Sequence, residues 1–170
     1  MRNAEFWLVY ILLLAGQLLL GNYFNLTPYL TLTILPVMVL CISIRTGPVG
    51  AMLIAFATGL TVDLLCEGVI GLNAFALVPV AFLRNPIIRL VFGGEMFARG
   101  EDFCPRRNGM AKAALATLLV TALFLVLYIW ADGAMMRPLW FDAARLGASF
   151  AGSSVLSILS LGALAPDTRK

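Results

Sequence analysis

The longest uncharged stretch is the feature that most constrains what this chain can fold into. No charged residue occurs between Glu5 and Arg45, although a helix needs only about 20 apolar residues to cross a bilayer. Charged residues make up 12% of the 170 residues, apolar residues make up 61%, and the mean hydropathy is +0.95. A water-soluble domain carries about 25% charged residues. The sequence therefore predicts a membrane protein with at least two crossings before residue 45.

Charged and turn-forming residues divide the chain into six apolar segments. A turn-rich segment at residues 21–28 separates the first two of them. Helices are expected throughout, because a lipid-facing backbone must satisfy its own hydrogen bonds and the segments are too uniformly apolar for barrel strands. We therefore predict an all-α bundle, a single domain over residues 1–170. Its six transmembrane helices are expected at residues 6–20, 29–44, 49–65, 68–84, 113–131 and 146–166.

The distribution of Lys and Arg predicts the orientation of the bundle. Ten of the twelve would lie on one side, with both termini and the second and fourth loops, so the positive-inside rule places both termini in the cytoplasm. The fourth loop, residues 84–112, carries six of them: Arg84, Arg89, Arg99, Arg106, Arg107 and Lys112. It is expected to contain a short helix starting at Asn85 and to face lipid headgroups or a cytoplasmic protein. The net charge of +3 is thus a topology signal, and no nucleic acid partner is predicted.

Two predicted helices carry ridges of small side chains at every fourth residue. One ridge ends in a carboxylate and comprises Ala51, Ala55, Gly59 and Asp63. The other comprises Ser149, Ser153 and Ser157. Small residues at this spacing let helix backbones approach closely, which drives helix association in lipid. We interpret both ridges as helix-packing devices.

Two other features admit more than one interpretation. Asp63 and Glu67 are four residues apart and could form a proton or cation site, but no other predicted helix offers a buried acid to complete it. An interfacial anchor or a hydrogen-bonding helix end is the preferred interpretation. Pro36 and Pro79 fall inside predicted helices, where each removes one backbone hydrogen bond and is expected to produce a kink.

The catalytic constellations known from small membrane enzymes do not occur in the sequence. The chain has no histidine, which removes the commonest general base and metal ligand. It also has no GxSxG or GxGD motif. The sequence predicts neither an enzyme nor a bound cofactor or metal ion.

Two consecutive blocks resemble a known family. Residues 59–65 and 71–77 read GLTVDLL and GLNAFAL, and they resemble the GLxxDL…LGxxAL signature of MreD, the rod shape-determining membrane protein. Residues 27–30, TPYL, are similar to the family's Pro-containing start of the second helix. The matching characteristic residues are Pro28, Gly59, Asp63 and Gly71. The long charged fourth loop departs from many members.

The resemblance implies a multi-pass scaffold of the bacterial inner membrane. Such a protein would be similar in fold to the substrate-binding subunits of energy-coupling-factor transporters and would catalyse no reaction. It would bind MreC, and it would work with RodA, a class B penicillin-binding transpeptidase and MreB in lateral peptidoglycan synthesis and cell-shape control. A small-molecule-binding membrane subunit of a transporter shares this architecture and remains the alternative.

Overall fold

The computed structural model describes residues 3–23, 31–67, 69–93, 109–133 and 139–164. Within these ranges all regular structure is helical, as the sequence predicts. The helices and helical turns are α1 (Asn3–Tyr23), α2 (Leu35–Leu40), the 3-10 turn η1 (Ile44–Thr46), α3 (Gly47–Val62), the π-helical turn η2 (Asp63–Glu67), α4 (Leu72–Phe92), α7 (Met110–Gly133) and α8 (Leu139–Leu164).

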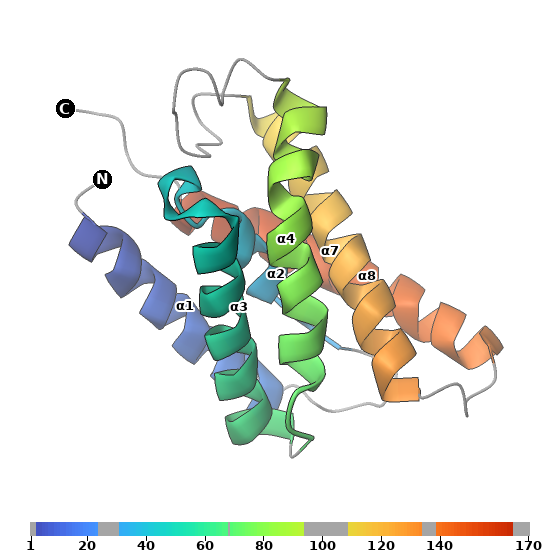
Figure 1. The fold of residues 1–170 in the computed structure, drawn as a ribbon. Coiled ribbons are helices and arrows are strands. Elements are labelled where there is room, and N and C mark those ends of the chain that lie inside the picture. Colours follow the sequence, from blue (N-terminus) through green and yellow to red (C-terminus); the bar gives the residue numbers. More distant parts are fainter. Residues whose placement is uncertain (1–2, 24–30, 68, 94–108, 134–138, 165–170) are drawn as a thin grey trace.

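The short helix α2 lies at the centre of the bundle (Figure 1). Helices α3, α4 and α7 stand side by side in alternating directions, while α1 and α8 run obliquely to them. All five of these helices contact α2. Every residue of α2 is buried, so this short helix is enclosed by the longer ones.

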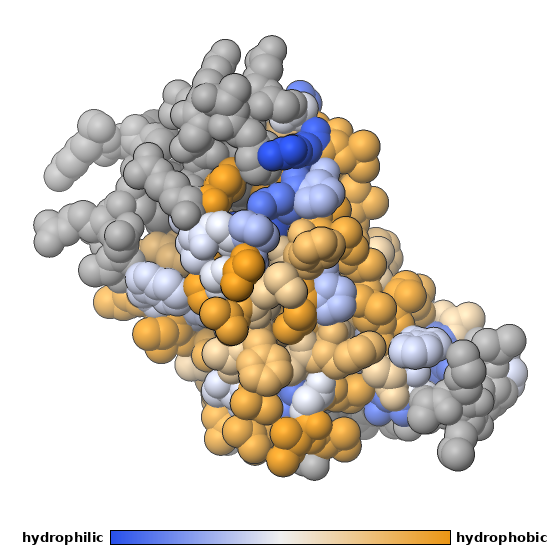
Figure 2. All heavy atoms as spheres, viewed as in Figure 1, coloured by the Kyte–Doolittle hydropathy of each residue, from blue (hydrophilic) through white to orange (hydrophobic). Residues whose placement is uncertain are grey.

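The outer surface of the bundle is apolar. Four helical segments are long and apolar enough to cross a membrane, and a shorter apolar segment covers Phe6–Asn22. The four are Gly47–Cys66, Leu72–Phe92, Met110–Gly133 and Trp140–Leu161. Figure 2 shows hydrophobic residues over much of the exterior, where a water-soluble protein would carry charge. The chain is therefore an all-helical membrane protein.

The second predicted helix, residues 29–44, is wrong in its described part. Residues 31–34 have no regular structure, α2 is six residues long, and a turn and η1 follow it. Pro36 stands in the first turn of α2, where a helix tolerates the missing N–H, so it produces no kink inside a helix. Pro79 does lie inside α4, as predicted.

The fourth predicted helix, residues 68–84, is wrong at both ends. Helix α4 begins at Leu72 and continues through Pro86 to Phe92, so there is no separate short helix starting at Asn85. The predicted boundary followed the charge of Arg84, but this side chain is fully buried in the protein. Residues 84–92 are thus part of a membrane-type helix, and the predicted loop 84–112 is too long. The other predicted segments, at residues 6–20, 49–65, 113–131 and 146–166, fall largely within α1, α3 with η2, α7 and α8.

Candidate functional site

Three of the residues that carry the family resemblance, Gly59, Asp63 and Gly71, meet where α3 and α4 join. Gly59 packs directly against the start of α4, because a Cβ at this position would lie 2.5 Å from the Cα of Ala74. Gly71 precedes α4 with φ +100°, a left-handed conformation that favours glycine. We call Gly59, Asp63, Gly71, Asn73 and Ala74 the motif cluster. It fixes the α3–α4 hairpin by close backbone contact.

The carboxylate of Asp63 caps the first turn of α4. Its Oδ2 accepts hydrogen bonds from the backbone N–H of Gly71 at 3.0 Å and of Ala74 at 3.2 Å. Its Oδ1 accepts from the backbone N–H of Asn73 at 2.9 Å and from Asn73 Nδ2 at 3.0 Å. Asp63 is fully buried, and both of its oxygens serve as helix-capping acceptors. The hydrogen-bonding helix end was therefore the correct interpretation of this residue; the side chain of Glu67 lies outside the described part of the structure.

Asp63→Ala is expected to lower the free energy of unfolding by about 2–4 kcal/mol, because four donors, three of them buried, lose their acceptor. The free energy of unfolding of Asp63→Asn should lie between those of the wild type and Asp63→Ala, since an amide keeps one acceptor oxygen. Thermal unfolding in detergent, followed by size-exclusion chromatography, measures both. Thr61→Ala, on the partly exposed side of the same helix, is the matched control and should change little. If Asp63→Ala left the thermal stability unchanged, the capping role of Asp63 would be contradicted.

The extended segment before α2 is held by side chains from two other helices. From α1, Gln17 donates from Nε2 to the carbonyl of Leu32 at 3.2 Å, and its Oε1 accepts the N–H of Ile34 at 2.8 Å. From α8, Ser149 Oγ accepts the N–H of Thr31 at 2.9 Å. These bonds replace the backbone hydrogen bonds that the unwound segment would have made in a helix.

Two further α8 residues complete this support. Ser153 Oγ accepts the N–H of Thr33 at 3.1 Å and donates to the carbonyl of Thr31 at 3.1 Å. Arg145 donates to Thr31 Oγ1 at 3.1 Å and forms an ion pair with Asp132 of α7. The ridge predicted for helix packing therefore also binds backbone.

The other end of α2 is held by Arg84. Its Nη1 donates to the carbonyls of Val39 at 3.3 Å and Ile42 at 2.7 Å, and its Nη2 donates to that of Ser43 at 3.0 Å. A cation at a helix C-terminus is favourable because the last carbonyls lack helical donors. Arg84 thus belongs to the bundle interior, and its assignment to a basic loop is wrong.

We call Gln17, Arg84, Arg145, Ser149 and Ser153 the α2 cradle. Irregular backbone is tolerated at membrane depth only where protein or enclosed water satisfies its polar groups. The cradle satisfies these polar groups at both ends of α2. The segment around α2 is therefore held in a fixed position at the centre of the bundle. Sequence reasoning overlooked Gln17, although it is the only glutamine in the chain and stands among leucines.

The remaining predicted residues divide into three groups. Ala51, Ala55 and Ser157 are fully buried, in agreement with a packing role. Arg89 is exposed in the last turn of α4, and Lys112 is exposed at the start of α7. Outside the described residues lie Pro28, Arg99, Arg106 and Arg107.

Comparison with models of known families, with curated proteins and with solved structures gave no match. Functional inference therefore depends on the motif cluster, the α2 cradle and the lipid-facing surface. The first two serve to hold the fold, because their polar groups bind neighbouring backbone. Among the described residues, the exposed apolar surface of the helices is available to other molecules.

Proposed function

We propose that this chain is a non-enzymatic scaffold of the MreD kind, which binds MreC and helps couple MreB to lateral peptidoglycan synthesis. The residues behind the resemblance support this. Gly59 and Asp63 hold two helices together, and the carboxylate is engaged as a helix cap. A motif with that role suits a protein whose function is to keep a fixed shape for its partners.

The lipid-facing surface of α8 is the single observation that carries the protein-binding proposal. Its outward residues are small over about two and a half turns, and all five are exposed: Ala143, Ala144, Gly147, Ala148 and Ala151. No side-chain or backbone atom lies within 4 Å of a Cβ built at Gly147. A partner helix could therefore approach the α8 backbone closely.

Other helices present large side chains at their outward positions. Leu53 and Phe56 do so on α3, Phe82 on α4 and Val126 on α7, each about half exposed or more. Large side chains fill space against lipid, whereas small residues at a helix surface allow close helix–helix contact. The small face of α8 accordingly fits the transmembrane anchor of a single-pass protein, as MreC is in the resembled family.

We further propose six crossings with both termini in the cytoplasm. Helices α1 and α3 run in the same overall direction, because Tyr10 bonds Thr58 at 2.9 Å and, eleven residues further along α1, Gly21 adjoins Cys66. The segment between them must return across the bundle, so α2 and its flanks would make the second crossing despite their short helix. The predicted excess of Lys and Arg on the side of both termini then supports an inner-membrane protein with both termini in the cytoplasm.

Gly147→Leu and Ala151→Leu are expected to reduce the recovery of MreC in co-purification from native membranes about tenfold, because leucine would keep the two helices apart. Both positions are exposed, so the amount of folded protein should stay the same. Ala57→Leu makes the same change on the exposed face of α3 and should leave MreC recovery unaltered. Equal losses in all three variants would contradict docking on α8, and no MreC with the wild type would contradict the proposed function.

The transporter-subunit alternative is supported by buried hydroxyls in α7 and α8. Within the described residues, the side chains of Thr121, Ser154 and Ser157 are buried without a hydrogen-bond partner. Hydroxyls that face inward could bind a polar metabolite or water. Mass spectrometry of the purified protein distinguishes the two functions: a retained polar metabolite favours the transporter subunit, and retained MreC favours the scaffold.

A further inference from the structure

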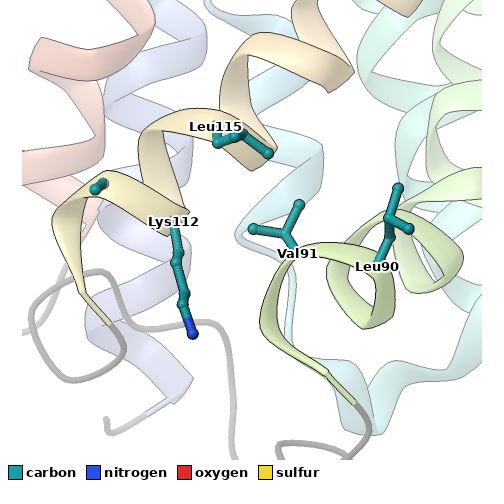
Figure 3. A pocket seen from close by; sticks show the side chains of 5 residues that line it. Leu90, Val91, Lys112 and Leu115 are labelled. Atoms are coloured by element: carbon teal, nitrogen blue, oxygen red, sulfur yellow. The ribbon is translucent and has the colours of Figure 1, made fainter.

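A groove opens between the last turn of α4 and the first turns of α7. Its volume is about 350 Å³, and Leu90, Val91, Ala111, Lys112 and Leu115 line it. In Figure 3, Val91 and Leu115 lie across the gap from one another, and the Lys112 amine extends past the helix end. Four of the five lining residues are apolar, and the fifth is a cation.

The groove lies at one end of the bundle, where the apolar segment Leu72–Phe92 ends and Met110–Gly133 begins. At such an end of a membrane-spanning helix, lipid tails give way to headgroups. Leu90 is 79% exposed and Leu115 is 50% exposed, so both present apolar surface outward. Lys112 is three residues before Leu115, about 4.5 Å nearer the beginning of α7. The groove therefore changes from apolar to positively charged along the direction in which a bilayer changes from tail to headgroup.

An apolar surface followed by a cation fits an amphiphile that has an apolar tail and an anionic head. The lining contains one positive charge and no carboxylate. A lysine near the membrane surface favours an anionic lipid by a factor of about five. A zwitterionic lipid would use the same apolar surface without that gain.

We propose that this groove binds one anionic phospholipid of the surrounding bilayer. Lys112 contacts the phosphate, and Leu90, Val91 and Leu115 pack along the upper part of an acyl chain. The bound lipid covers the α4–α7 junction and steadies the helix ends there. The inference is independent of the proposed MreC scaffold, because it uses a different face of the bundle.

Native mass spectrometry of the purified full chain with phosphatidylglycerol or phosphatidylcholine tests the proposal. The wild type should retain phosphatidylglycerol about fivefold better. Lys112→Gln should remove this preference, and Ala111→Phe should lower retention of both lipids by filling the groove. Arg89→Gln is the matched control, because this exposed cation at the same end of α4 does not line the groove.

Three results would overturn the proposal. Equal retention of the two lipids by the wild type would show that charge plays no part. Equal effects of Lys112→Gln and Arg89→Gln would mean that the preference comes from general surface charge. Displacement of phosphatidylglycerol by millimolar inorganic phosphate would identify an anion site in place of a lipid site. Monodisperse chromatography of each variant verifies that the fold is intact.

Discussion

A single methyl group at position 59 is expected to separate α3 from α4. The added Cβ in Gly59→Ala would lie 2.5 Å from the Cα of Ala74, 2.6 Å from its N and 2.9 Å from the carbonyl carbon of Asn73. These are backbone atoms, which cannot rotate away as a flexible side chain would. Overpacking of a well-packed interior costs about 1–3 kcal/mol, and we expect at least the upper value here. Gly59→Leu should lower the yield of folded protein further.

Glycines elsewhere in the bundle provide matched controls. At Gly16 in α1 and Gly147 in α8, a Cβ would meet no atom within 4 Å. Gly16→Ala and Gly147→Ala should therefore keep or slightly raise stability, because alanine has the better helix propensity by about 1 kcal/mol. The measurements are the yield of monodisperse protein and the thermal unfolding midpoint in detergent. A Gly59→Ala protein as stable as these controls would contradict the close α3–α4 contact.

Removal of the guanidinium at position 84 is expected to release the C-terminal end of α2. Arg84→Met keeps much of the side-chain length but leaves the carbonyls of Val39, Ile42 and Ser43 without these donors. Each of the three lost hydrogen bonds to the charged group is worth about 1.5 kcal/mol or more, so the free energy of unfolding should fall by about 4.5 kcal/mol or more. That is a large part of the total stability of a typical protein.

Arg89→Met is the control for this change, because it removes the same charge from an exposed position of the same helix. The unfolding midpoint of Arg84→Lys should lie between those of the wild type and Arg84→Met. An ammonium keeps the charge but lacks the planar guanidinium that can donate to several carbonyls at once. Thermal unfolding in detergent measures all three, and protease accessibility near Cys41 reports the local release of α2. Similar unfolding midpoints for Arg84→Met and Arg89→Met would show that the buried arginine does not hold α2.

An intramembrane arginine is usually examined first as a site for ions or substrates, because a charge there is costly to bury. Arg84 lies about 12 Å from the end of α4, at eight residues before Phe92. In this chain its Nη1 and Nη2 donate to backbone carbonyls at and after the end of α2. The charge stabilises an irregular segment, which in turn lets α2 be short enough to fit at the centre of five helices.

Much of the fold follows from the sequence by arguments about single segments. Apolar length identified the long helices α3, α7 and α8, and α3 begins at Gly47, within a few residues of the predicted start at residue 49. The ridge of Ala51, Ala55 and Gly59 faces inward, as small-residue spacing indicates. These properties depend on a residue and its near neighbours along one helix, so the pattern in the chain is sufficient.

The two errors in the helix boundaries share one cause. A charged residue was taken to mark a membrane surface at Arg84, and an uninterrupted apolar run was taken to mark a helix at residues 29–44. Both rules assume that a segment must satisfy its own polar groups. In the folded protein, Arg84 satisfies the carbonyls after α2, while Gln17 and Ser153 satisfy the backbone before it. Each segment therefore does not have to satisfy its own polar groups, because hydrogen-bond partners on other elements do so.

The sequence by itself determined that this chain is a helical membrane protein, because hydrocarbon excludes charge and unpaired backbone whatever the arrangement of the helices. It also determined which side chains are small enough for close contact. Only the tertiary structure decided that the apolar segment around α2 is mostly unwound, that Asp63 caps α4 and that Arg84 points inward. Each of these depends on a hydrogen-bond partner that is distant in sequence or on another element, and only folding brings the two groups together.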